Sequence, residues 1–202
     1  AAYPTDDGWL RAYPHLVAED GCQAVLALRK SGQHSLYLPK AAIDRYQGNG
    51  ALLPLLGLDY VLMGHNCLLL HSSVVEFSGK TLLFSGDSGV GKSTQADLWQ
   101  QHMGATVRNG DRCALSVRGE TFWGGGCPYA GSSGIYDPGE APLAGIVFLE
   151  QGPENHIRPL TGREAFTMLF AQSLANPWDA DYTDKLCDLI SRLIQSVPIY
   201  KM

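Results

Sequence analysis

Eight consecutive residues have the types and spacing of a phosphate-binding loop. They match the pattern G-x-x-x-x-G-K-[ST] at every position, and they are Gly86, Asp87, Ser88, Gly89, Val90, Gly91, Lys92 and Ser93. Glycines let backbone N–H groups converge on a polyphosphate, and a helix N-terminus adds unpaired donors and partial positive charge. Lys92 can reach the β- and γ-phosphates, and the Ser93 hydroxyl can ligate Mg²⁺. The alternative is a glycine-rich turn that matches by chance.

The residues around this loop supply the context that the pattern requires. Residues 81–85 are apolar and strand-sized, and residues 93–99 can continue as a helix, which places Thr94 with the binding residues. The chain before the loop reads as a strand over residues 73–77 and a tight turn at 78–80. The strand that enters the loop is therefore expected to be one arm of an antiparallel hairpin, unlike the parallel unit of ordinary loop-containing NTPases.

Asp111 is the main candidate for an acidic group beside the phosphates. It follows a predicted strand over residues 105–108, and strand ends on that side of a sheet face the ligand crevice. A carboxylate there can ligate Mg²⁺ or accept a proton from an attacking hydroxyl. The alternative is an Asx turn within residues 109–111. Arg112 comes next and either stabilises charge on the transferring group or lies on the surface of the following hairpin.

Two further residues have competing interpretations. Glu150 follows the apolar run 146–149 and could handle Mg²⁺ as in standard NTPases, but the Gln-Gly-Pro that follows favours a solvated residue at a hairpin exit. His71 ends another apolar run, where a hydrogen-bonded core histidine is the ordinary expectation.

The order of these parts resembles the HPr kinase/phosphorylase family and its relatives in the ATP-dependent phosphoenolpyruvate carboxykinase superfamily. The resemblance is carried by Leu70-His71, by the loop of residues 86–93 and by Asp111, and it covers about residues 70–149. It implies an α/β, P-loop-containing fold like that of the HPr kinase C-terminal domain and the carboxykinases, a mixed sheet with antiparallel hairpins flanked by helices. The chain departs from the family at Gly110-Asp111, where paired aspartates are usual, so it resembles a compact, divergent member.

The resemblance also implies roles for single residues. Lys92 would contact the phosphates, Ser93 would ligate Mg²⁺, Asp111 would be the catalytic acid/base or a second metal contact, and His71 would lie beside the transferring phosphoryl group. The implied activity is a kinase that moves the γ-phosphoryl of Mg²⁺·ATP to a hydroxyl, with a serine of a protein or peptide as the expected acceptor. A small-metabolite kinase, for example one acting on free serine, and a non-catalytic ATP-sensing module stay open. Relatives form hexamers, so a homo-oligomer is also implied.

The bulk composition restricts the class of protein. With 202 residues and 45% hydrophobic residues we expect one domain, in which residues 1–66 pack on a kinase core of residues 67–202. A net charge of −5 argues against a nucleic-acid partner. The apolar run 51–70 is interrupted by polar residues and reads as a helix and a strand, not a membrane span. The cysteines lack C-x-x-C spacing, which indicates reduced thiols and a cytoplasmic protein; they are Cys22, Cys67, Cys113, Cys127 and Cys187.

Outside the loop, periodicity and turn residues predict the remaining elements. Hairpins are expected for 23–28 with 35–38, for 113–117 with 121–123, and for 145–149 with 156–158. Helices are expected over residues 52–63, 162–175 and 181–196, and strands over 67–70 and 197–202. The glycine-rich stretch 124–134 reads as a loop near the ligand.

Overall fold

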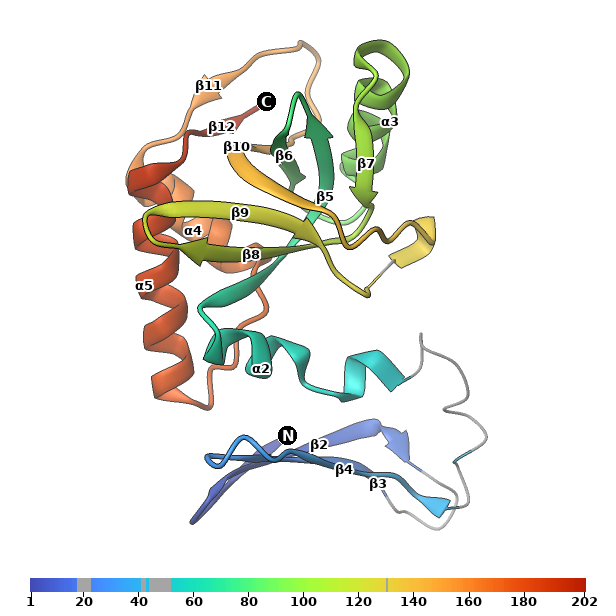
Figure 1. Cartoon of the computed structure of the whole chain (residues 1–202), viewed down its shortest axis with the longest axis vertical. Helices are drawn as coiled ribbons and strands as arrows, with labels where there is room; N and C mark the ends of the chain where they lie inside the picture. The colour runs from blue at the N-terminus through green and yellow to red at the C-terminus, as the bar shows by residue number, and fades with distance from the viewer. Residues whose placement is uncertain (18–22, 41–42, 44–51, 130) are drawn as a thin grey trace. The chain divides into compact units, whose positions relative to one another are not determined.

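The chain divides into two units, Ala1–Val61 and Leu62–Met202 (Figure 1). This computed structural model describes residues 1–17, 23–40, 43, 52–129 and 131–202. The observed boundary lies within helix α2 (Leu58–Gly64). The boundary that we expected, at residue 66, lies slightly later, in the turn that follows this helix.

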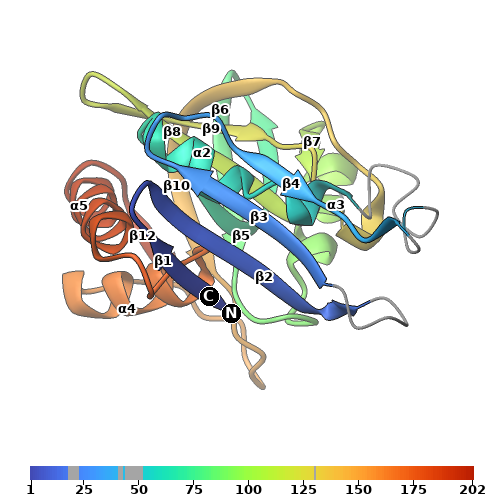
Figure 2. The same ribbon diagram turned by 90° about the horizontal axis from the view of Figure 1, so that it is seen from below.

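The N-terminal unit contains a four-stranded antiparallel sheet in the order β1-β2-β3-β4, which Figure 2 shows broadside. Its strands are β1 (Ala2–Thr5), β2 (Gly8–Val17), β3 (Gln23–Arg29) and β4 (Ser35–Tyr37). Alternation along β3 places Ala24, Leu26 and Leu28 on one face, where they form a core with Tyr13 and Leu55. The hairpin expected for 23–28 with 35–38 is confirmed.

The helix expected over residues 52–63 is interrupted. The structure has a 3₁₀ helix η2 (Leu53–Leu55) followed by α2, which begins at Leu58. Between them Gly57 adopts a φ of 60°, and a Cβ at this position would lie 2.6 Å from Cδ2 of Leu26. The left-handed backbone and the close approach to β3 end the first helical turn before the second begins.

The C-terminal unit is a mixed α/β structure built on an eight-stranded sheet. The strands are β5 (Cys67–Phe77), β6 (Lys80–Ser85), β7 (Thr106–Asn109), β8 (Arg112–Arg118), β9 (Thr121–Gly126), β10 (Glu140–Phe148), β11 (Arg158–Pro159) and β12 (Ile199–Lys201). Their main order is β11-β12-β10-β6-β5-β8-β9, with β7 paired to β5. Because β10 also pairs with β9, the pairings close a ring of five strands.

Strand β5 joins the two halves of this sheet. Its residues up to His71 pair with β8, and its residues from Ser72 onward pair with β6. The two strands expected at 67–70 and 73–77 are thus one continuous strand. The predicted hairpin between β5 and β6 is confirmed, and Ser78 and Gly79 both have positive φ, as a tight two-residue hairpin turn requires.

Helices lie on both sides of the sheet in the C-terminal unit (Figure 1). Helix α3 (Lys92–Met103) packs through Ala96 and Trp99 against an apolar cluster of the sheet that includes Val75 and Phe84. Helices α4 (Gly162–Gln172) and α5 (Ala180–Ser196) pack against each other on the other side. A reciprocal capping box of Thr161 and Glu164 begins α4.

Two expectations for this unit are wrong. Residues 124–126, expected in a loop, continue β9 and pair with β8 and β10. An added Cβ would lie 2.7 Å from Cγ2 of Thr81 at Gly124, and 2.9 Å from Cβ of Glu140 at Gly125. Glycine here permits close packing and does not signal a turn. The segment expected to pair with β10 forms β11, which pairs with β12 instead, because β12 lies between β11 and β10.

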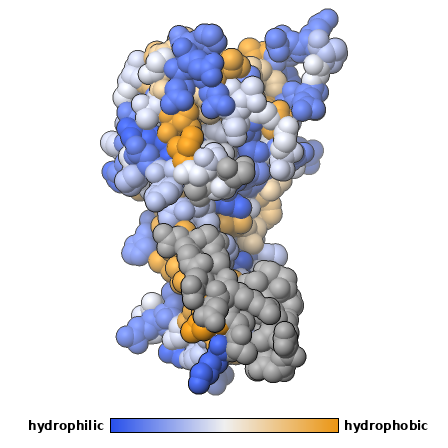
Figure 3. Space-filling view, turned by 90° about the vertical axis from the view of Figure 1, so that its right-hand side faces the viewer, coloured by the Kyte–Doolittle hydropathy of each residue, from blue (hydrophilic) through white to orange (hydrophobic). Residues whose placement is uncertain are grey.

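The exposed surface of the C-terminal unit is largely hydrophilic on the face drawn in Figure 3, where apolar residues form small separate areas. Within the described chain, no helix is both long and apolar enough to cross a membrane. Four of the cysteines are free thiols, as expected, and Cys22 lies outside the described residues.

Candidate active site

The predicted phosphate-binding residues form the connection between β6 and α3. Gly86, Gly89 and Gly91 have φ values of 135°, 79° and 115°, which side chains with a Cβ rarely adopt. Gly91 is the N-cap of α3, and no side chain of the described chain caps the helix there. The backbone N–H groups of the first helical turn, which includes Ser93 and Thr94, are therefore left for another acceptor.

Lys92 is the first residue of α3 and is only 7% exposed. Its Nζ donates to the backbone carbonyls of Gly86 at 3.0 Å and Asp87 at 2.9 Å, so the ammonium group lies over the loop. Burial lowers the pKa of Lys92, and the carboxylates of Asp111 and Asp87 act in the opposite direction. The loop thus contains a desolvated cation that two acidic side chains help to keep charged.

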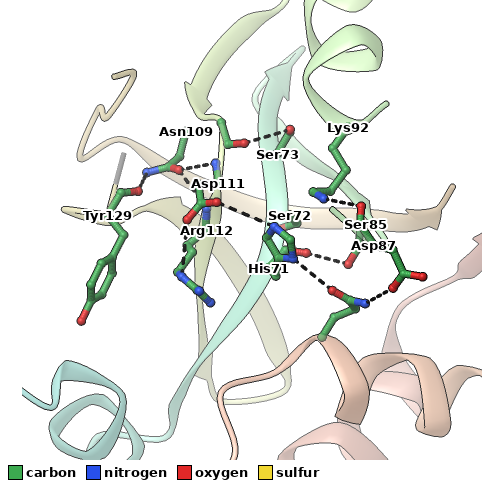
Figure 4. Close-up of polar contacts among 12 residues, drawn as sticks. His71, Ser72, Ser73, Ser85, Asp87, Lys92, Asn109, Asp111, Arg112 and Tyr129 are labelled. Carbon is green, nitrogen blue, oxygen red and sulfur yellow. Dashed lines mark hydrogen bonds and ion pairs between the residues drawn. The ribbon is translucent and has the colours of Figure 1, made fainter. Parts of the chain in front are cut away.

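The structure brings His71 and Asp111 together. His71 lies where β5 changes partner, opposite Arg112 of β8, and the N–H of Ser72 donates to the backbone carbonyl of Asp111 at 3.0 Å. As a result, Nε2 of His71 is 3.7 Å from Oδ1 of Asp111 (Figure 4). The sequence placed these residues 40 positions apart, and only the resemblance linked them.

Asn109 orients the backbone that carries Asp111. Its side chain is fully buried, and Oδ1 accepts the N–H groups of Asp111 at 2.8 Å and Arg112 at 2.9 Å. Its Nδ2 donates to the carbonyls of Cys127 and Tyr129. The Asx turn considered for these residues exists, but Asn109 makes it. The carboxylate of Asp111 therefore faces His71 and Arg112 instead of capping its own turn (Figure 4).

The charges around the pair favour a neutral His71. Burial lowers the pKa of His71, and Lys92 lowers it further. A hydrogen bond to Gln172 and the carboxylate of Asp111 act in the opposite direction, and Arg112 lowers the pKa again. Nε of Arg112 lies 3.5 Å from Oδ2 of Asp111, so the carboxylate has a cationic neighbour on its other side. This arrangement pairs a carboxylate with an uncharged imidazole near neutral pH.

A short 3₁₀ turn, η3 (Gly131–Ser133), packs directly on Asp111. Gly131 has a φ of 56°, and a Cβ there would lie 2.6 Å from Cβ and 3.0 Å from Oδ1 of Asp111. The predicted loop near the ligand thus begins after β9 and touches the candidate acid, while Ala130 lies outside the described residues. Glycine at 131 is what allows the approach.

A cavity of about 470 Å³ opens beside the loop. It is lined by residues 86–90, by residues 148–151 at the end of β10, and by one face of α4 that includes Gln172. This volume is in the range of small-molecule sites. Glu150, the rival acidic residue, lies here; its side chain is 64% exposed and pairs with Nζ of Lys201 at 2.6 Å, which agrees with a solvated residue.

Sequence reasoning missed two residues of the site. The first is Gln172, which hydrogen-bonds both His71 and Asp87. It lies far from the loop in the sequence and is part of no recognisable motif. Gly131 was counted only as part of a flexible stretch. A glycine that contacts an acidic side chain leaves no signal in one sequence, because the same residue also serves turns.

Comparison with known proteins finds similarity among solved structures only, and it is distant. No protein-family model and no curated protein matches the chain. Among solved structures, the chain is similar to the Hpr(Ser) kinase/phosphatase from Coxiella burnetii, with a TM-score of 0.37 and 11% sequence identity, over 66% of this chain and 84% of that one. With a similarity this distant, the family expected from the resemblance stays a prediction.

Proposed function

We propose that the chain is an ATP-dependent phosphotransferase that moves the γ-phosphoryl group of ATP to a hydroxyl, with a serine of a protein or peptide as the acceptor. The observation that carries the proposal is the chain of contacts from the loop between β6 and α3 to the His71–Asp111 pair. Nζ of Lys92 donates to the carbonyl of Asp87, the carboxylate of Asp87 accepts from Gln172, and Gln172 contacts His71. A phosphate-binding loop beside a carboxylate that can accept the hydroxyl proton suits phosphoryl transfer to a hydroxyl.

The loop supplies binding and charge stabilisation. The free N–H groups at the start of α3 and the positive-φ glycines suit the β- and γ-phosphates. Lys92 can turn its ammonium group from the carbonyls of Gly86 and Asp87 toward phosphate oxygens, where it offsets charge that develops during transfer. Positioning and electrostatics of this kind account for most of the catalysis in phosphoryl transfer.

Asp111 and His71 handle the acceptor. The acceptor oxygen forms a bond to the γ-phosphorus as the bond from that phosphorus to the β,γ-bridging oxygen breaks, and ADP leaves. The hydroxyl proton passes to Asp111, whose carboxylate is held by the Asn109 turn and flanked by Arg112. His71, neutral and 3.7 Å away, faces the same carboxylate oxygen.

The oxygen donors near the loop fit Mg²⁺. The metal prefers hard oxygen ligands and is usually held by one or two carboxylates or hydroxyls together with substrate phosphates. Ser93, exposed in the first turn of α3, and Asp111 are such donors, and no cluster of three or more metal-binding side chains occurs among the described residues. Ser93 would hold the ion, which would neutralise phosphate charge, and Asp111 would be its second ligand in the alternative to the role of base.

The decisive experiment follows the γ-phosphate. The protein is incubated with γ-labelled ATP, Mg²⁺ and a desalted extract of its source cell, with and without added small metabolites. Label in an acid-stable protein or peptide supports the proposal, provided that Lys92→Ala abolishes it and Lys185→Ala, which changes an exposed lysine of α5, does not.

The other outcomes identify the alternatives. Label that moves only into small molecules indicates a metabolite kinase. ATP binding without any transfer contradicts the proposal and indicates a nucleotide sensor.

A further inference from the structure

We propose that Gln172 is a positioning residue that accepts a hydrogen bond from Nδ1 of His71 and thereby holds Nε2 of the ring toward Asp111. The contacts on which this assignment stands do not depend on the reaction. Its catalytic consequence rests on the proposed function.

The backbone holds Gln172 opposite His71. Gln172 is the last residue of α4, and the chain that leaves the helix bridges β5 in antiparallel fashion, with Ser173 opposite Leu70. The N–H of Leu174 donates to the carbonyl of Leu69, which continues this pairing. In antiparallel register the residue before Ser173 faces the residue after Leu70, so the two side chains meet across the bridge.

The hydrogen bonds of the amide fix its orientation. Nε2 of Gln172 donates to Oδ1 of Asp87 at 3.0 Å, and an ionised carboxylate can only accept. The other end of the amide, Oε1, therefore faces Nδ1 of His71 at 3.1 Å. Because an amide oxygen can only accept, Nδ1 must carry the hydrogen.

The tautomer decides what faces Asp111. Because Nδ1 carries the hydrogen that Gln172 accepts, Nε2 is the nitrogen that faces Asp111, 3.7 Å from its Oδ1. When the acceptor hydroxyl reacts, its O–H bond breaks and the proton passes to Asp111, while the new P–O bond forms and the bond to the β,γ-bridging oxygen breaks. His71 then lies beside the carboxylate that has received the proton.

The same amide links His71 to the phosphate loop. Asp87 is a loop residue, and its backbone carbonyl accepts Nζ of Lys92 while its carboxylate accepts Gln172. Four charged groups thus surround the imidazole: Lys92 and Arg112 lower its pKa, Asp111 raises it, and Asp87 reaches it through the amide of Gln172. The imidazole keeps its tautomer only while this chain of contacts is intact.

Histidine NMR tests the assignment directly. In protein with ¹⁵N-labelled histidine, the His71 signals are identified by their absence from His71→Gln. At a pH where the imidazole is neutral, we expect its hydrogen on Nδ1. Gln172→Met keeps the length of the side chain and removes its polar atoms, so it should shift the tautomer toward Nε2–H and lower the pKa of His71. Gln172→Glu should raise that pKa. An Nε2–H tautomer in the wild type, or an unchanged tautomer and pKa in Gln172→Met, would overturn the assignment.

Kinetics test the catalytic consequence separately. We expect Gln172→Met to lower kcat by about tenfold, the scale for losing a residue that orients a site group, with KM for ATP nearly unchanged. Gln195→Met on the exposed face of α5 is the matched control and should not differ from wild type. A tautomer change in a protein without transferase activity would support the positioning and refute only the proposed function. Full kcat in a variant with the altered tautomer would refute the catalytic role.

Discussion

The side-chain oxygen of Asn109 accepts the backbone N–H of Asp111 at 2.8 Å, so an uncharged, fully buried residue fixes the backbone of the candidate acid. The amide nitrogen of the same side chain donates to the carbonyls of Cys127 and Tyr129. One side chain thus ties the end of β7 to the segment that leads into the turn over Asp111. The position of the carboxylate depends on both halves of this amide.

Asn109→Asp keeps the accepting oxygen of this side chain and removes its donating NH₂ group. The new carboxylate can still accept the N–H groups of Asp111 and Arg112, but it cannot donate to the two carbonyls. We expect a loss of roughly 1–3 kcal/mol in the free energy of unfolding, measured by urea denaturation, because buried acceptors lose their donor. Asn66→Asp, at an exposed turn, should change it by less than about 0.5 kcal/mol. Equal effects of the two substitutions would contradict the role given to Asn109.

Gly131→Ala tests the close contact with Asp111. Its Cβ would lie 2.6 Å from Cβ of Asp111, so either the acid or the turn has to move. Gly134→Ala is the matched control, because Gly134 also has positive φ but has nothing within 4 Å of the added Cβ.

Both alanines strain the backbone by about 1–2 kcal/mol, but only Gly131→Ala should lower kcat, by about 10- to 100-fold, since small misplacements of a catalytic group are costly. The measurement is steady-state kinetics of phosphoryl transfer. Similar kcat values for the two variants would show that the position of Asp111 does not depend on this contact.

The parts of the site that one sequence could predict are those with local signals. The loop of residues 86–93 could be predicted because eight adjacent positions match one pattern. The hairpin of β5 and β6 could be predicted from two apolar runs on either side of Ser78-Gly79. Asp111 was expected at a strand end, and the structure places it in the two-residue turn between β7 and β8. Each prediction used residues that are neighbours in the chain.

The parts that could not be predicted depend on pairing across the fold. Gln172 reaches His71 only because the end of α4 bridges β5. β11 pairs with β12, the last strand of the chain, so the expected partner of β10 could not be found from adjacent runs. In the sequence, Gly124 and Gly125 are typical of a loop. Only the fold shows that Thr81 and Glu140 pack so closely on them that no side chain would fit.

The lowered pKa of His71 predicts a pH dependence of stability. As the pH falls below 7, the unfolded chain takes up a proton on this histidine more readily than the folded chain does, so unfolding becomes more favourable. The stabilisation is present above the usual histidine pKa and is lost as the pH falls through the lower folded value. His71→Gln should reduce the decrease in the urea midpoint between pH 7.5 and pH 5.5. His102→Gln, at an exposed position of α3, is the control, and equal decreases in His71→Gln and wild type would contradict the prediction.

Asp111→Asn and Lys92→Ala should each lower kcat by at least ~10²-fold, the scale for losing one group that stabilises or deprotonates in the transition state. The reasons differ, and so should the rest of the kinetics. Asp111→Asn keeps the size of the side chain but removes the charge that faces His71 and Arg112, so KM for ATP should change little.

Lys92→Ala also removes the two hydrogen bonds that hold the loop carbonyls of Gly86 and Asp87, so it should weaken ATP binding as well. Circular dichroism of both variants checks that the fold is intact. Near-normal turnover by Asp111→Asn would exclude this carboxylate as the base for the acceptor, but it would not contradict phosphate binding at the loop. His71 would then be the remaining group of the pair that can take the proton.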